Sequence, residues 1–149
     1  MYKRILVAVD VAELDIMPPG VAAAIEMAGM TDGAVRLINV RSPVPLSQAE
    51  FMMPEFFVES QQKALAELQA FAKNFESLKG GVSALCRLGP VYAEVLQEAK
   101  DWDADLIIVS SHQPSMATYL LGSNAAKIVR HAECTVLVVR AGKKQSLFA

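Results

Sequence analysis

Cysteine is scarce in this sequence, and its placement argues against two kinds of site. The chain has two cysteines, Cys86 and Cys134, which lie far apart, and it has no C-x-x-C pair. Such spacing suggests neither a zinc site nor a dithiol redox centre. We interpret both residues as small buried hydrophobic side chains, and their sparse use fits a reducing, cytoplasmic location.

Long apolar runs and an excess of one charge are also missing. The apolar runs span four to five residues, whereas a helix needs about 20 to cross a bilayer. The start of the chain, MYKRILVAVD, lacks a small-residue cleavage site and therefore predicts a first strand rather than a signal peptide. The net charge is −2, so no basic footprint for nucleic acid is present. We expect binding to neither membranes nor nucleic acids.

Two common nucleotide-binding motifs are absent as well. The sequence has no G-x-x-x-x-G-K-[ST] phosphate loop, and no G-x-G-x-x-G follows its first predicted strand. No lysine or arginine stands in the loop before the last helix as a charge clamp, and Arg87 and His112 are the nearest candidates. Without such a clamp, or a base paired with a nucleophile, an enzyme such as a slow ATP hydrolase is disfavoured.

The sequence does contain a regular alternation of buried strands and amphipathic helices. Runs rich in Val, Ile and Leu, without polar alternation, are typical of strands buried on both faces of a parallel sheet. They cover Arg4–Val9, Val35–Val40, Val82–Leu88, Leu106–Val109 and Thr135–Val139. Apolar stripes at helical spacing lie between them. We predict one doubly wound α/β domain over residues 1–141, with helices on both faces of a five-stranded parallel sheet, and a C-terminal tail over 142–149.

The segment 41–57 interrupts this alternation. It contains three prolines and a group of large apolar residues, Phe51, Met52, Met53, Phe56 and Phe57. Such a segment either packs as a flap onto its own domain or forms a lid or partner surface, because large exposed apolar patches usually mark interaction sites. Its end is expected to begin the longest helix.

Small and polar residues follow the predicted strands. In open parallel sheets, ligands bind outside the carboxyl ends of the strands, where the strand order reverses. Asp10 follows the first strand and Val40 ends the second, while Val109, Ser110 and His112 lie at the end of the fourth. Asp10 is either the cap of the next turn or an acceptor for a ribose hydroxyl or a base amine. His112 either contacts a ligand or is merely solvated.

Gly122, Ser123 and Asn124 open the last predicted helix. A helix N-terminus presents free backbone N–H groups and partial positive charge, and glycine lets an anion approach the backbone closely. Ser and Asn are also favoured N-caps where no ligand is bound. Because these residues end a loop that leaves the carboxyl end of a strand, we favour a phosphate cradle whose second side is Ser110.

Four stretches resemble the universal stress protein family over nearly the whole chain: RILVAVD, LINV, ADLIIVSSH and LLGSNAAKIVRHAECTVLVVR. Nucleotide-binding members of that family carry G-x2-G-x9-G-[ST] between the fourth strand and the last helix. Gly122 and Ser123 match its third glycine and hydroxyl, whereas Ser110 stands at the first glycine and Gln113 or Pro114 at the second. The stretch SSHQPSMATYLLGSNA is more similar to the small F/G-type bacterial members, in which S-[HN]-x-P replaces the glycines.

The resemblance implies the strand order 3-2-1-4-5 and ATP as the ligand. Because the loop before the last helix has no lysine or arginine, Mg²⁺ could offset the triphosphate charge. Asp10 would then lie near the adenosine, the Val40 backbone at the adenine edge, and Ser110 at the ribose or phosphates. The phosphates would be held by the start of the last helix, Gly122, Ser123 and Asn124. Val109 and His112 complete the set of expected nucleotide contacts.

The resemblance also bears on assembly and function. In that strand order, Thr135–Val139 is an edge strand without proline or an inward charge, and such an edge invites pairing. We therefore predict an antiparallel homodimer through this strand, as in relatives. The implied function is that of a nucleotide-binding regulatory protein of the stress response. The alternative is a stress-related interaction dimer that binds no nucleotide.

Overall fold

The computed structural model describes residues 1–41, 54–111 and 122–140. The elements follow in the order β1 (Arg4–Ala8), η1 (Val11–Glu13), α1 (Pro19–Thr31), β2 (Ala34–Arg41), α3 (Pro54–Ala72), η2 (Lys73–Phe75), β3 (Val82–Leu88), α4 (Val91–Asp101), β4 (Leu106–Ser111), α5 (Ser123–His131) and β5 (Thr135–Arg140). All the predicted strands are present, and the largest shift in a boundary is at β4, which continues to Ser111.

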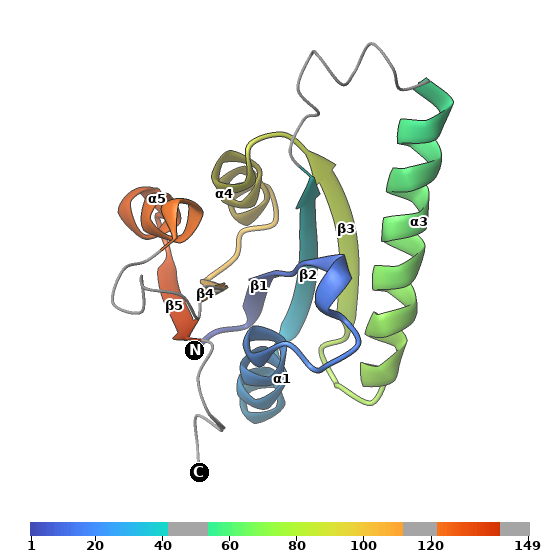
Figure 1. The fold of residues 1–149 in the computed structure, drawn as a ribbon. Coiled ribbons are helices and arrows are strands. Elements are labelled where there is room, and N and C mark those ends of the chain that lie inside the picture. The colour runs from blue at the N-terminus through green and yellow to red at the C-terminus, as the bar shows by residue number, and fades with distance from the viewer. Residues whose placement is uncertain (42–53, 112–121, 141–149) are drawn as a thin grey trace.

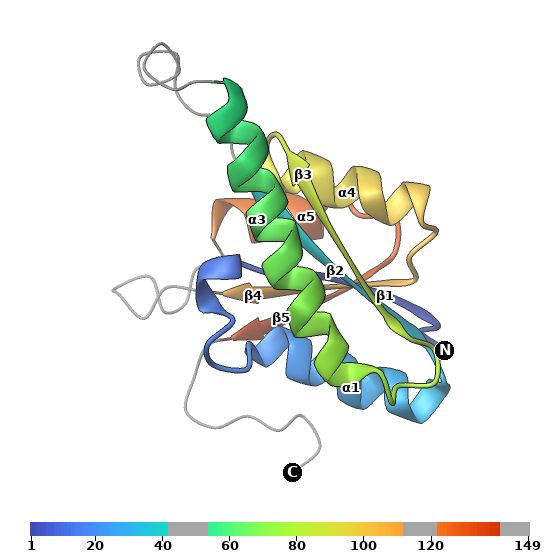
Figure 2. The same ribbon diagram turned by 90° about the vertical axis from the view of Figure 1, so that its right-hand side faces the viewer.

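The strands form one parallel sheet in the order β3-β2-β1-β4-β5. Helices α1 and α3 cover one face of this sheet, and α4 and α5 cover the other (Figure 1). The predicted doubly wound fold and its strand order are therefore confirmed. Helix α3 begins beyond the carboxyl ends of β2 and β3 and runs back along the sheet (Figures 1 and 2).

The sheet is buried on both faces, which explains the unbroken apolar runs in the sequence. In β1, Ile5 and Val7 pack with the cluster under α1 and α3, whereas Leu6 packs with the cluster under α4 and α5. Leu68 of α3 and Ile128 of α5 complete the two clusters. Burying each such side chain stabilises the fold by about 1.5–3 kcal/mol, so the sheet is held from both sides.

Helices α1 and α4 each begin at a proline. Pro18 and Pro90 are the N-caps of α1 and α4, and both have extended backbone. Proline is tolerated there because its missing N–H is not required at a helix start. Pro90 therefore fixes where α4 begins beside the end of the sheet.

Glu98 of α4 ties that helix to β2 and β3. Its carboxylate is almost buried and accepts from Arg36 Nη1 of β2 and Arg87 Nη1 of β3, each at 2.7 Å. Arg87 also pairs with Glu94 at 2.7 Å, and Arg36 lies over the Trp102 ring. A buried carboxylate without partners would cost several kcal/mol. Arg87 is thus occupied in holding α4, which removes it as a candidate charge clamp.

The two cysteines are free, and both are half-buried rather than fully buried as predicted. Cys86 packs at the margin of the cluster under α1 and α3, and Cys134 at the margin of the other cluster. Burial raises the pKa of both thiols, so neither is predisposed to act as a thiolate at neutral pH.

Three predicted features fall partly or wholly outside the described residues. Arg41 ends β2 and Pro54 begins α3, so the segment 41–57 does lead into the longest helix, as expected. Residues 42–53 of that segment and the tail beyond Arg140 lie outside the described part, as does His112.

Among the described residues, none of the helices combines the length and the hydropathy that crossing a bilayer requires.

Candidate functional site

Strand β1 stops short of its two neighbours at its carboxyl end. Its pairing with β2 ends at Ala8, whereas β2 continues to Arg41 beside β3. Its pairing with β4 ends at Val7, whereas β4 continues to Ser111 beside β5. The edge of the sheet therefore has a notch above the end of β1, between residues 39–41 and 109–111, which we call the β1 notch. The strand order reverses here, and open α/β sheets bind ligands at such a point.

A pocket with a cavity volume of about 740 Å³ lies in the β1 notch. This volume is in the range of small-molecule sites. The pocket is lined by the end of β1 and η1, by both overhanging strands, and by α3, α4 and α5: Ala8, Val9, Asp10, Val11, Ala12, Ile38, Asn39, Val40, Arg41, Ser60, Lys63, Ala64, Glu67, Val91, Val109, Ser110, Asn124, Ala125 and Ile128.

The pocket has an apolar floor and polar walls. Val9, Ile38 and Val109 at its base are buried and belong to the two core clusters. The charged and amide side chains come from the surrounding turn, overhangs and helices. This division suits a ligand with a flat apolar part and polar substituents.

Asp10 stands at the wall of the pocket where β1 leads into η1. It is the N-cap of η1, and its Oδ1 accepts a hydrogen bond from the Ala12 backbone N–H at 3.0 Å. Among the described residues, no second hydrogen bond to the carboxylate is found. Asp10 therefore caps the turn, which was the first of the two predicted alternatives. It also lines the pocket, where its carboxylate can accept further hydrogen bonds.

Asn124 lies on the opposite side of the pocket, in the first turn of α5. Its Oδ1 accepts a hydrogen bond from the Tyr92 backbone N–H at the start of α4, at 3.3 Å. Lys127 lies over the Tyr92 ring, with its Nζ 4.6 Å from the centroid. Because Oδ1 is engaged, the Nδ2 group of Asn124 remains as a donor beside the backbone N–H groups of the helix start, which have no partner within the helix.

The other two residues of the predicted phosphate side are placed differently. Gly122 is the N-cap of α5 and Ser123 its first helical residue, and no side chain in the described part of the protein caps this helix start. Both residues are exposed, and neither is among those that line the pocket. A Cβ on Gly122 would meet no atom of residues 1–41, 54–111 and 122–140 within 4 Å, so packing against these residues does not require glycine there. Their contact with phosphates stays a prediction.

Three further predicted residues line the pocket, although the side chain of one of them, Ser110, is directed away from Asn124. Val40, Val109 and Ser110 all line it. A Cβ added to Gly20 would lie 2.9 Å from Ser110 Oγ, so this hydroxyl is directed toward the start of α1. Ser110 and Asn124 thus share one pocket, although the Ser110 side chain faces the α1 side of the sheet.

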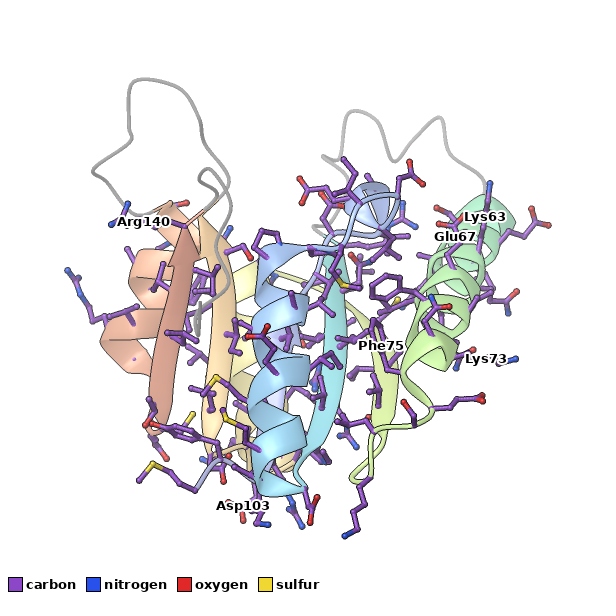
Figure 3. All side chains as sticks on the ribbon, turned by 90° about the horizontal axis from the view of Figure 1, so that it is seen from below. Lys63, Glu67, Lys73, Phe75, Asp103 and Arg140 are labelled. Atoms are coloured by element: carbon purple, nitrogen blue, oxygen red, sulfur yellow. The ribbon has the colours of Figure 1, made fainter. Side chains whose placement is uncertain are left out.

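The sequence analysis missed the part of the pocket wall that α3 forms beside the β2 overhang. Arg41 Nη1 donates to Ser60 Oγ, and Lys63 and Glu67 follow along α3 (Figure 3). Residues 60, 63 and 67 share one helical face, which is a signal that the sequence does contain. The loop before α5 contains no lysine or arginine. Arg41 and Lys63, on the opposite wall of the pocket, supply positive charge instead.

Residues 1–140 match the model of the Universal stress protein family. The chain belongs to this family. It is 34% identical over 143 residues to universal stress protein G of Shigella flexneri, an alignment that covers 94% of this chain and 100% of that protein. The resemblance inferred from the sequence motifs is thereby confirmed.

Solved structures of the universal stress protein family share the fold. UspA from Lactobacillus plantarum superposes with a TM-score of 0.75 at 19% identity, covering 93% of this chain and 98% of that one. A universal stress protein from Archaeoglobus fulgidus, solved in complex with dAMP, gives a TM-score of 0.59 at 17% identity, covering 93% and 98%. At these identities the likeness establishes the fold. The bound dAMP is a finding about the Archaeoglobus protein.

Proposed function

We propose that the pocket in the β1 notch binds an adenine nucleotide, with ATP as the ligand, and that the chain is a regulatory protein of the stress response. The observation that carries this proposal is that Asp10 and Asn124 line the same pocket, on either side of its apolar floor. A carboxylate can accept from ribose hydroxyls or the adenine amine, and an amide donor at a helix N-terminus suits phosphate oxygens. The dAMP complex of the Archaeoglobus family member supports the same ligand class.

Magnesium would enter this site with the nucleotide. No group of three His, Cys, Asp or Glu side chains that could hold a metal ion is found among residues 1–41, 54–111 and 122–140. The donor set of the pocket therefore suits Mg²⁺ carried on a triphosphate, which usually keeps several waters, rather than a resident ion.

Nucleotide content tests the proposal without any mutation. Protein purified without added nucleotide is expected to release an adenylate on acid denaturation, or else to bind ATP in calorimetry once the ligand has been removed. Chromatography of the released material identifies the base and the number of phosphates. Protein that releases no adenylate and gives no heat with ATP, ADP or AMP would leave the alternative function, an interaction dimer without nucleotide.

We also propose that β5 pairs with its counterpart in a second copy to form an antiparallel homodimer. Strand β5 lies at the end of the sheet, and Val136, Leu137 and Val138 in it are apolar and half-buried. An apolar edge strand without proline or an inward charge invites pairing. Sedimentation is expected to give twice the 16.1 kDa chain mass, and Val138→Pro a monomer or insoluble protein. A soluble dimeric Val138→Pro protein would contradict this interface.

A further inference from the structure

Asn39 and Glu98 are the two polar or charged side chains that are buried among the described residues. Glu98 is satisfied, because its carboxylate accepts from Arg36 and Arg87 at 2.7 Å. In the described part of the chain, Asn39 Nδ2 donates only to Cys86 Sγ, at 3.9 Å, and Oδ1 accepts no hydrogen bond. A thiol sulfur is a weak acceptor. Asn39 is therefore a buried amide whose hydrogen-bonding capacity is almost unused, and such a group needs an explanation.

The unused side of this amide opens into the pocket of the β1 notch. Asn39 lines that pocket, although only 7% of the residue is exposed. Among the described residues, each fully buried side-chain oxygen or nitrogen has a hydrogen-bond partner. Asn39 Oδ1 has no partner there, so it is not fully enclosed and is reached through the pocket. The amide is thus a preformed donor and acceptor at the wall of the cavity.

Asn39 stands next to the backbone that is expected at the adenine edge. The Val9 N–H donates to the Ile38 carbonyl at 2.9 Å, and backbone groups two residues apart on a strand face the same neighbour. The Val40 backbone therefore faces the β1 side, as that of Ile38 does, but the pairing with β1 ends at Ala8. The N–H and C=O groups of Val40 thus open into the β1 notch. Consecutive Cα atoms are about 3.8 Å apart, so a base that meets the Val40 backbone lies beside the Asn39 amide.

We infer that Asn39 determines specificity for adenine by pairing with the N6 amine and N7 of the base. Oδ1 accepts from the N6 amine, and the second hydrogen of Nδ2 is donated to N7, as in the usual recognition of adenine by an asparagine amide. The Val40 backbone is left for N1 and the other N6 hydrogen. A purine with oxygen at position 6 would set that acceptor against Oδ1 and leave both unpaired. This inference rests on the proposed nucleotide site and adds how its base is distinguished.

Calorimetry with ATP, 7-deaza-ATP and inosine triphosphate tests this pairing. 7-deaza-ATP carries a C–H group in place of N7, which the Val40 backbone does not contact in this arrangement, and inosine triphosphate carries oxygen in place of the N6 amine. We expect the unmodified protein to bind ATP at least about tenfold more tightly than either analogue. Asn39→Ala should reduce the preference over 7-deaza-ATP to about twofold or less, and the preference over inosine triphosphate by at least about threefold.

Two further variants keep the test independent of packing defects. Asn39→Leu retains the size of the side chain without its donor and acceptor, so it should lose the same preferences without leaving a cavity. Cys86→Ala is the matched control, because it removes the Sγ contact of Asn39 and leaves the amide in place. It should keep the full preference for ATP over both analogues.

The outcomes separate this inference from the proposed function. Equal binding of ATP and 7-deaza-ATP by the unmodified protein overturns the pairing and leaves the nucleotide site standing. Preferences that persist in Asn39→Ala and Asn39→Leu overturn it too, because Asn39 would then have only a structural role. If the unmodified protein binds none of the three nucleotides, the proposed function itself is wrong and the inference falls with it.

Discussion

Asn124→Asp is expected to weaken ATP binding at least about thirtyfold, or about 2 kcal/mol, without disturbing the fold. The substitution keeps the shape of the side chain and the oxygen that accepts from the Tyr92 N–H. It replaces the Nδ2 donor with a second carboxylate oxygen, which repels a phosphate at the pocket wall. Calorimetry of the two proteins with ATP measures the difference.

Thermal stability provides the control for this variant, because the substitution is expected to weaken ATP binding but to maintain or raise the stability of the fold. An acidic residue in the first turn of a helix complements the helix dipole and stabilises it by about 0.3–1 kcal/mol. The thermal midpoint of Asn124→Asp should therefore equal or exceed that of the unmodified protein. Asn74→Asp makes the same chemical change at an exposed residue of η2 and should bind ATP normally. Unchanged ATP affinity in Asn124→Asp would remove Asn124 from the phosphate site.

Gly80→Ala is expected to destabilise the fold by about 3 kcal/mol, at the upper end of typical overpacking. A Cβ on Gly80 would lie 2.0 Å from the Gly33 carbonyl oxygen and 2.2 Å from its carbon. Both atoms belong to the backbone, so no side chain can rotate away. Gly33 leads into β2 and Gly80 into β3, and the turns before these two strands would have to separate.

Thermal unfolding measures the cost of that separation. For a chain of this size, 3 kcal/mol corresponds to a fall of about 6–12 °C in the midpoint. Gly29→Ala is the matched control, because it lies within α1 and its added Cβ would meet nothing within 4 Å. Alanine there should stabilise the helix by about 0.5–1 kcal/mol. A Gly80→Ala midpoint equal to that of the unmodified protein would show that the turns are not in contact.

The sheet could be predicted from the sequence because its signal is local. Residues Leu106, Ile107, Ile108 and Val109 of β4, for example, are buried between the two helix layers and therefore appear as an unbroken apolar run. Asp10, Val40, Val109 and Ser110 could be assigned to the site for a related reason, since residues at the carboxyl ends of parallel strands converge at one edge. The strand order itself came from the resemblance to the family.

The pocket's shape could not be predicted, because it depends on relative strand lengths. The β1 notch exists because β2 continues to Arg41 and β4 to Ser111 while β1 stops. Helical spacing does put Ser60, Lys63 and Glu67 on one face of α3. It does not reveal how far that helix extends past the sheet, so this wall was missed.

The start of α5 shows how one position in a helix turn decides which residue faces a ligand. Gly122, Ser123 and Asn124 were predicted to act together. The helix begins with Gly122 as its N-cap, and among these three it is Asn124 that lines the pocket. A shift of one residue in the helix start would present a different side chain, and sequence patterns locate helix starts less finely than that.

The location of the ligand is tested most directly by titrating ¹⁵N-labelled protein with AMP and following the backbone amide signals. We predict saturable shifts that are largest around the β1 notch, at residues 9–12, at Val40 and Arg41, and at Asn124 and Ala125. The amides of residues 81–84, which border a second, smaller cavity beside the end of α3, should move little. Saturable shifts centred there, with the notch amides unchanged, would contradict the assignment of the nucleotide to the β1 notch.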